Sequence, residues 1–274
     1  MLYGEIRIWE GNYSGKVKGK AVLTYYIQDN SPEIDMDRKR PTILICPGGG
    51  YGFVSDRENE PVAMRFLAEG FNAVTLKYEV APSVRHPQPL LDISRAMWII
   101  RENALEWNVD INRISVCGFS AGGHLAASLG VLWNEGYISD LTGMPEGINK
   151  PNAMILCYPV ITSGDYAHRG SFVNLLGTDE ISEHLIMSLE KKVDRNTPPA
   201  FLWHTFDDEL VPVENSLLFA AALREKGIPF ELHIYPSGVH GLSLCNKETA
   251  VKPELINPHA GTWFDLCVEW LKTM

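Results

Sequence analysis

One serine of this chain stands where a serine can act as a nucleophile. Residues 118–122 read Gly-Phe-Ser-Ala-Gly, so Ser120 lies between two glycines. An apolar, strand-like stretch precedes them at 114–117, and a helix-forming stretch follows at 123–129. A Gly-x-Ser-x-Gly run between a strand and a helix holds the serine hydroxyl on a tight turn above a sheet. The sequence therefore predicts a nucleophilic serine, although the five residues alone are also typical of a glycine-rich turn.

A base and an acid follow further along the chain. A serine hydroxyl becomes nucleophilic when a histidine takes its proton, and a carboxylate orients that histidine. His240 lies in a glycine-flanked loop, 238–241, after an expected strand. Of the adjacent acids Asp207 and Asp208, the second is favoured because it opens an Asp-x-x-Val-Pro run into the next helix. The predicted catalytic residues are thus Ser120, Asp208 and His240, with Asp207 expected to bind loop amides.

Consecutive glycines supply candidate donors for the negative charge that develops during acyl transfer. The expected strand at 42–46 runs into Pro-Gly-Gly-Gly-Tyr at 47–51. Glycines let backbone N–H groups turn inward without side-chain obstruction, and the residue after the nucleophile contributes another donor. The predicted oxyanion hole therefore consists of the amides of Gly49, Gly50 and Ala121. A phosphate-binding loop is the alternative, but no Gly-Lys-Ser/Thr follows the glycines.

Three further side chains are candidates for substrate binding. Tyr51 and Arg57 follow the glycines closely, and His168 lies in a long polar segment at 162–198. Connections of this length are usually functional, so this segment is expected to form a cap or pocket wall with a helix near 180–191; a surface decoration is the alternative. No cluster of Cys and His has the spacing of a metal site, and neither metal nor cofactor is expected.

The elements that must position these residues alternate between strands and helices. Strands are expected at 42–46, 73–77, 114–118, 153–158, 200–204 and 230–235, and helices near 61–68, 90–106, 121–133, 214–226 and 261–271. The first 26 residues instead indicate two antiparallel strands. This order predicts an α/β fold with a mostly parallel central sheet, antiparallel N-terminal edge strands and helices on both faces. A single domain over 1–274 is expected.

Composition narrows the class of partner. A chain of 274 residues with 45% hydrophobic content can bury a large core, and its formal charge of −10 offers no basic surface to nucleic acid. No secretory leader and no apolar run of membrane-spanning length is visible. Five cysteines without CxxC spacing fit a reducing compartment. We expect a cytoplasmic protein, a monomer or small homo-oligomer, with a small-molecule substrate and neither a nucleic-acid nor a membrane partner.

Taken together, these residues resemble the α/β-hydrolase superfamily over essentially the whole chain. The matching segments are 47–51, 118–124, 208–212 and 238–241. The chain looks most like small intracellular esterases related to acetylxylan esterases and hormone-sensitive-lipase-type enzymes. The resemblance implies the α/β-hydrolase fold, a Ser120–His240–Asp208 triad and an acyl-enzyme intermediate. It also implies hydrolysis of short acyl esters, including those of acetylated sugars and xylo-oligosaccharides.

Two departures separate the sequence from the lipase type. Pro47 stands where such families commonly have a histidine, and Phe119 stands where the lipase-type elbow often has an aspartate. Both favour the sugar-ester branch. A serine peptidase, amidase, thioesterase or lactonase would use the same residues, although peptidases of the prolyl-oligopeptidase type usually carry a large gating domain that is not visible here. The alternative from another class is a non-catalytic binding module, which typically lacks a triad member.

Overall fold

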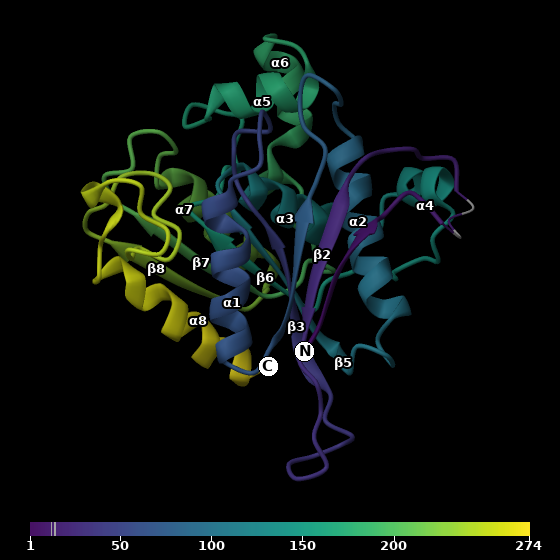
Figure 1. Cartoon of the computed structure of the whole chain (residues 1–274). Helices are drawn as coiled ribbons and strands as arrows, with labels where there is room; N and C mark the ends of the chain where they lie inside the picture. Colours follow the sequence, from purple (N-terminus) through teal and green to yellow (C-terminus); the bar gives the residue numbers. More distant parts are fainter. Residues whose placement is uncertain (12, 14) are drawn as a thin grey trace.

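The strands of this chain join into one sheet. The computed structural model describes residues 1–11, 13 and 15–274. Within these residues, eight strands run in the order β1-β2-β4-β3-β5-β6-β7-β8 (Figure 1). They are β1 (Leu2–Arg7), β2 (Val22–Ile27), β3 (Arg40–Cys46), β4 (Asn72–Lys77), β5 (Val109–Phe119), β6 (Ala153–Cys157), β7 (Ala200–Thr205) and β8 (Phe230–Tyr235). The pairs β1–β2 and β2–β4 are antiparallel and the remaining pairs are parallel, so the expected sheet is confirmed.

The central strands are buried and mostly apolar because both faces of the sheet are covered. Every residue of β6 and of β7 is buried, whereas five of the six residues of the edge strand β8 are only half-buried or exposed. Burial on both faces is what makes parallel strands read as near-continuous apolar runs rather than as alternating ones. The sequence pattern of strands in the sheet centre therefore follows directly from the two helical layers.

The helices form one layer on each face. They are α1 (Glu60–Ala68), α2 (Gln88–Glu102), α3 (Ala121–Leu132), α4 (Gly136–Thr142), α5 (Arg169–Leu176), α6 (Ile181–His184), α7 (Glu214–Lys226) and α8 (Trp263–Lys272). On one face, α1 and α8 lie side by side, and the rings of Phe66 and Phe264 are 4.7 Å apart (Figure 1). On the other face, α2, α3 and α7 pack over a second apolar cluster.

The segment 162–198 stands above the carboxyl ends of the parallel strands, where α5 and α6 form the top of the molecule in Figure 1. The expected helix near 180–191 is wrong, because α6 ends at His184 and two short 3-10 turns follow. Ser188 lies between these turns with an extended backbone (φ −80°, ψ 95°). Its hydroxyl bonds Glu190 Oε1 and the Ser163 amide, and such side-chain bonds compete with helix formation.

The remaining differences from expectation concern the start of β5, which lies at Val109 rather than at 114, helix ends and short helices. Neither α4 nor α5 was expected, and α2 ends at Glu102 rather than near 106. Both unexpected helices stop at a glycine in the left-handed conformation, Gly143 (φ 70°) and Gly177 (φ 79°). Such C-terminal glycines are a usable signal, but a helix of seven or eight residues gives too little periodicity to be recognised.

The cysteines are packing residues. All five lie in the described ranges, are buried and carry free thiols. Burial raises the pKa of the Cys46 and Cys267 thiols well above the usual value, which keeps them in the unreactive form. Across residues 1–11, 13 and 15–274, no helix has both the length and the apolar character that crossing a bilayer requires.

Candidate active site

Ser120 occupies the sharp turn between β5 and α3. Its backbone has φ 53° and ψ −119°, a conformation that costs energy for any residue with a side chain. The turn is held because the Ser120 amide donates to Cys157 O at 3.0 Å, while the Ser120 carbonyl accepts from the amides of His124 and Val160. These hydrogen bonds hold the strained backbone in place. A strained turn that is fixed in this way is typical of a nucleophilic serine.

The glycines on either side of Ser120 are required by close packing. A Cβ on Gly118 would lie 2.1 Å from Gly122 O, and a Cβ on Gly122 would lie 2.1 Å from Cys46 O. A side chain at either position would push α3 away from β5 and β3. The Gly-x-Ser-x-Gly pattern is therefore explained by the approach of the helix to the sheet.

His240 connects Ser120 to Asp208. Its Nε2 lies 2.8 Å from Ser120 Oγ, and its Nδ1 lies 2.6 Å from Asp208 Oδ2. Because an ionised carboxylate only accepts hydrogen bonds, Nδ1 carries the imidazole proton and Nε2 is left to accept from the serine hydroxyl. This tautomer is the one that can remove the hydroxyl proton, so the three side chains have the geometry that a nucleophile, base and acid require.

Asp208 is held in its ionised form although it is buried. Its Oδ1 accepts from the amides of Leu210 and Val211, each at 3.0 Å. Burial opposes ionisation, but the neighbouring imidazoles of His204 and His240 outweigh it, so the pKa of the Asp208 carboxyl lies well below its usual value. An ionised carboxylate at this position keeps accepting the hydrogen bond from His240 Nδ1.

The adjacent acid has a different partner. Asp207 Oδ1 accepts from the Gly238 amide at 2.7 Å, at the start of the loop that carries His240. His204, at the end of β7, lies closer to Val211 O (2.9 Å) than to Asp208 Oδ2 (3.5 Å) and supports the turn beneath the acid. The structure thus brings Asp208 to His240 and leaves Asp207 to fix the loop.

The predicted oxyanion donors lie against the nucleophile. Gly49 and Gly50 have φ values of 130° and 60°, which residues with side chains rarely adopt. A Cβ on the preceding Gly48 would lie 3.0 Å from Ser120 Cβ, so this loop packs directly on the elbow. Among the described residues, no group accepts a hydrogen bond from the amides of Gly49, Gly50 or Ala121. They are therefore available to a developing oxyanion.

The side chain of Tyr51 points into the protein. It is buried, and its hydroxyl donates to His124 Nδ1 at 2.9 Å, because His124 Nε2 already donates to Met187 O at 3.0 Å. Burial lowers the pKa of His124 to about 4, so this imidazole is neutral near pH 7. The substrate contact expected for the Tyr51 phenol does not fit this placement; the phenol instead ties the glycine loop to α3.

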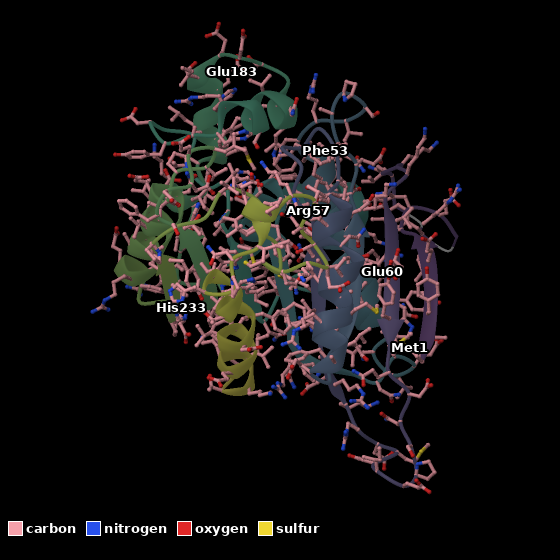
Figure 2. All side chains as sticks on the ribbon, turned by 60° about the vertical axis from the view of Figure 1, so that its left-hand side comes forward. Met1, Phe53, Arg57, Glu60, Glu183 and His233 are labelled. Carbon is pink, nitrogen blue, oxygen red and sulfur yellow. The ribbon has the colours of Figure 1, made fainter. Side chains whose placement is uncertain are left out.

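Arg57 is likewise engaged within the protein. Its guanidinium donates to Gly241 O at 2.7 Å and to Thr249 O at 2.5 Å. In Figure 2 the labelled Arg57 lies where the yellow C-terminal segment passes the start of α1. Its Nε and Nη2 donors face backbone carbonyls of 241–249, so these two groups are engaged within the chain, and the expected substrate contact stays a prediction.

His168 does reach the site. It is half-buried, its Nδ1 lies 2.8 Å from Ser171 Oγ, and its Cε1 would lie 3.9 Å from a Cβ built on Gly50. Burial and the nearby His240 lower the pKa of His168, so it is neutral near pH 7. Of the three side chains predicted to bind substrate, His168 is the one that the structure brings over the oxyanion loop.

Two residues that the sequence did not reveal complete the site. Glu58 is buried and bonds both the Gly48 amide and the Tyr158 hydroxyl, each at 2.7 Å. Glu58 belongs to no spacing motif. Tyr158 directly follows β6 at the carboxyl edge of the sheet, where the other site residues also lie. This position after a parallel strand could have predicted Tyr158 as a site residue. Over the described ranges, no group of three or more His, Cys, Asp or Glu residues could hold a metal ion.

Comparison with known families agrees with this geometry. The family model BD-FAE matches residues 31–223, which include Ser120 and Asp208. The chain belongs to the BD-FAE family. The match ends before His240, so His240 is assigned to the candidate site by its hydrogen bonds to Ser120 and Asp208 rather than by the family model.

The individual relatives of this BD-FAE member include a xylanase and an acetylxylan esterase. Endo-1,4-beta-xylanase B of Butyrivibrio fibrisolvens is 47% identical over 221 residues, which cover 77% of this chain and 34% of the relative. Acetylxylan esterase of Xylanibacter ruminicola is 29% identical over 253 residues, covering 90% of this chain and 45% of the relative. The chain therefore spans less than half the length of either protein.

Among solved structures, the chain is similar to the acetyl ester-xyloside bifunctional hydrolase from Caldicellulosiruptor lactoaceticus. The two share 38% identity with a TM-score of 0.83, and the match covers 98% of this chain and 96% of the other. A likeness of this extent confirms the α/β-hydrolase fold over the full length.

Proposed function

We propose that this protein is a serine carboxylesterase that removes short acyl groups from sugar esters such as acetylated xylo-oligosaccharides. The observation that carries the proposal is the continuous hydrogen-bonded series Ser120–His240–Asp208; beside it lie glycine-loop amides that have no acceptor within the described part of the chain. The sugar part rests on similarity to an acetylxylan esterase and to an acetyl ester-xyloside hydrolase.

In the proposed reaction, His240 takes the proton of Ser120 as Oγ attacks the ester carbonyl. The carbonyl oxygen becomes negatively charged and accepts hydrogen bonds from Gly49, Gly50 and Ala121, while Asp208 stabilises the imidazolium. His240 then gives the proton to the leaving alcohol, and a water molecule releases the acyl group by the same steps in reverse. These residues carry the whole reaction.

We propose that His168 contacts the leaving alcohol. Its Nδ1 is occupied by Ser171, and its Nε2 has no partner among the described residues. A neutral imidazole can donate to or accept from a sugar hydroxyl. A cavity of about 370 Å³, lined in part by Gly52, Arg85 and Asn174, lies beside the oxyanion loop and offers polar groups to further hydroxyls. A hydroxyl-rich leaving group fits these surroundings better than a lipid does.

We further propose that the chain acts as one domain in which 162–198 is a fixed pocket wall. Asn174 donates to Gly50 O at 2.8 Å, and Met187 O accepts from His124, so this segment is bonded to both the oxyanion loop and α3. A cytoplasmic location, consistent with the five free thiols, and a monomer or small homo-oligomer remain part of the proposal; sizing by light scattering tests the latter.

Labelling with a fluorophosphonate tests the nucleophile. The wild-type protein should be modified on Ser120, and Ser120→Ala should lose both labelling and ester hydrolysis, a loss on the order of 10⁶ in rate, with an unchanged melting temperature. The elbow depends on its glycines and not on the hydroxyl, so the fold should persist. A wild-type protein that neither labels nor hydrolyses esters would be a binding module.

The acyl and alcohol preference needs a substrate panel. Values of kcat/KM should be highest for p-nitrophenyl acetate and fall through butyrate to octanoate and palmitate, in steps, because each methylene changes binding by only about 1–3 kcal/mol. Acetylated xylo-oligosaccharides should be deacetylated, and matched anilides should be poor substrates. An efficiency that rises toward octanoate would contradict the sugar-ester part, and efficient anilide cleavage would indicate an amidase.

A further inference from the structure

We infer that Arg57 and Glu58 form a clamp that fixes the oxyanion loop relative to the loop of His240. The inference rests on the proposed function and adds two positioning residues to it. Both lie in the 3-10 turn Asp56–Glu58, between the glycine loop and α1. Neither belongs to the triad or to the expected oxyanion donors.

One arm of the clamp is the Glu58 carboxylate. Its Oε2 accepts from the Gly48 amide and its Oε1 accepts from the Tyr158 hydroxyl, each at 2.7 Å. Glu58 is only 3% exposed, so water does not compete for these bonds. A Cβ on Gly48 would lie 2.8 Å from Glu58 Oε2, so the carboxylate sits where only glycine leaves room for it.

The direction of the bonds at Tyr158 can be deduced. The Ser243 amide, three residues beyond His240, donates to the Tyr158 oxygen at 2.8 Å, and a backbone amide can only donate. The phenol proton must therefore point to Glu58, and both carboxylate oxygens are acceptors. The Tyr158 ring also packs against the His240 ring, with centroids 5.1 Å apart. Glu58 thus reaches the His240 side of the site through Tyr158.

The second arm is Arg57, whose contacts converge on the same loop. Its guanidinium donates to Gly241 O, next to His240, and its own carbonyl accepts from Ser243 Oγ at 2.8 Å. Figure 2 shows Arg57 at the junction of the C-terminal segment and the start of α1. Two adjacent residues therefore hold both sides of the catalytic centre.

Such a clamp affects the catalytic rate because the oxyanion loop and the His240 loop must both be correctly placed at the same time. Oxyanion donors act when they lie about 2.7–3.1 Å from the charged oxygen, and a misplacement of about 1 Å can cost about 100-fold. The oxyanion loop and the His240 loop are far apart in sequence, so no local structure sets their separation. We assign that task to Arg57 and Glu58.

The sharpest test is Glu58→Gln, which keeps the size and changes one acceptor into a donor. If the new amide faces Gly48, two N–H groups oppose each other. If it faces Tyr158, the phenol oxygen accepts from the amide and Ser243, and the phenol proton has no acceptor. We expect kcat to fall about 10- to 100-fold with KM within about 3-fold of wild type.

Glu60→Gln is the matched control, since Glu60 is exposed two residues further on. Rates are referred to the concentration of fluorophosphonate-reactive sites, so that unfolded protein does not count. If Glu58→Gln keeps a kcat within about 2-fold of the Glu60→Gln variant, or loses only melting temperature, the clamp is refuted. If wild type itself fails to label and hydrolyse, the proposed function has failed instead.

A double variant, Tyr158→Phe with Glu58→Gln, tests the coupling. Tyr158→Phe removes the hydroxyl and should by itself lower kcat. In that background the side chain introduced by Glu58→Gln can turn its N–H groups toward the ring and its oxygen toward the Gly48 amide. The second loss should therefore be at least about 5-fold smaller than in the wild-type background. Losses that multiply independently would contradict a shared hydrogen-bonded unit.

Arg57→Lys tests the second arm, because one ammonium cannot serve Gly241 O and Thr249 O in the fixed geometry of a guanidinium. Here kcat should fall about 3- to 10-fold, with Arg65→Lys as a control at a partly exposed arginine. Equal kcat in the two variants would remove Arg57 from the clamp.

Discussion

Two buried aspartates of this chain differ in what surrounds them. Asp208 follows β7 in the active site, and Asp92 lies on α2, outside it. Asp92 accepts hydrogen bonds from Trp9 Nε1 (2.7 Å), Gln88 Nε2 (2.9 Å) and the Glu79 amide (2.9 Å). Each carboxylate therefore has three close donors and almost no contact with water.

The pKa values of the two carboxyls nevertheless move in opposite directions. Burial raises the pKa of Asp92 to about 7, since its donors are neutral and the nearby Glu79 is negative. At Asp208 the imidazoles of His204 and His240 overcome burial and lower the pKa. The comparison teaches that the number of hydrogen bonds does not decide the charge of a buried acid. The charge of a buried acid depends instead on whether its hydrogen-bond partners can carry positive charge.

Among substitutions of the aspartates, the largest effect should come from Asp208→Asn, which removes the negative charge of the active site. Asp208→Asn keeps the shape but leaves an amide beside His240 Nδ1, which favours the wrong tautomer. We expect kcat to fall on the order of 10⁴-fold with the fold intact, measured on p-nitrophenyl acetate with circular dichroism as the control. A loss of less than about 10-fold would mean that Asp208 does not orient the base.

At Asp92 the same substitution should affect stability and spare kcat. A carboxyl whose pKa is raised by folding contributes stability that is present below its unfolded pKa, near 3.8, and is lost as the pH rises through about 7. As the pH rises between these values, the free energy of unfolding of the wild type should therefore fall relative to that of Asp92→Asn, by at most about 4 kcal/mol. Urea unfolding at several pH values measures it; a difference independent of pH would contradict the raised pKa.

Asp208 should behave in the opposite sense. Its pKa is lowered by folding, so its contribution to stability is present above the unfolded pKa and is lost as the pH falls below it. The stability difference between wild type and Asp208→Asn should therefore favour wild type more at pH 7 than at pH 3, and it should shrink as the pH falls below the unfolded pKa near 3.8. The same urea series measures both variants. If the two stability differences changed with pH in the same direction, the opposite pKa shifts of Asp92 and Asp208 would be contradicted.

The smallest effect should come from Asp207→Asn. An asparagine oxygen can still accept from the Gly238 amide, so the loop of His240 keeps its anchor. We expect kcat within about 3-fold of wild type. A loss as large as that of Asp208→Asn would show that both acids are needed in the charged form.

The residues that could be predicted from the sequence are those whose signal is local. The strands β3, β4 and β5 were recognisable as apolar runs, and the nucleophile by the glycines that close packing demands beside it. The base and acid were recognisable because each follows a strand. Their positions reflect the rule that the carboxyl ends of parallel strands share one edge.

What could not be predicted depends on partners that are distant in the chain. Tyr51 and Arg57 have the chemistry of substrate-binding residues, yet their partners are His124 and the backbone of 241–249. Glu58 bonds Tyr158 across a hundred residues. Likewise, Ser188 breaks the expected helix because its hydroxyl bonds the amide of Ser163. No short-range pattern encodes such pairings.

The bond from Asn174 to Gly50 O has a consequence for protein engineering. The segment 162–198 is an obvious part to transplant between esterases when a new leaving group is wanted. Asn174 on α5 donates a hydrogen bond to a carbonyl of the oxyanion loop. An exchange that removes the Asn174 side chain would therefore lower the rate of hydrolysis of every substrate, whether or not it is the intended one. A graft that keeps Asn174 and varies its neighbours would separate selectivity from turnover.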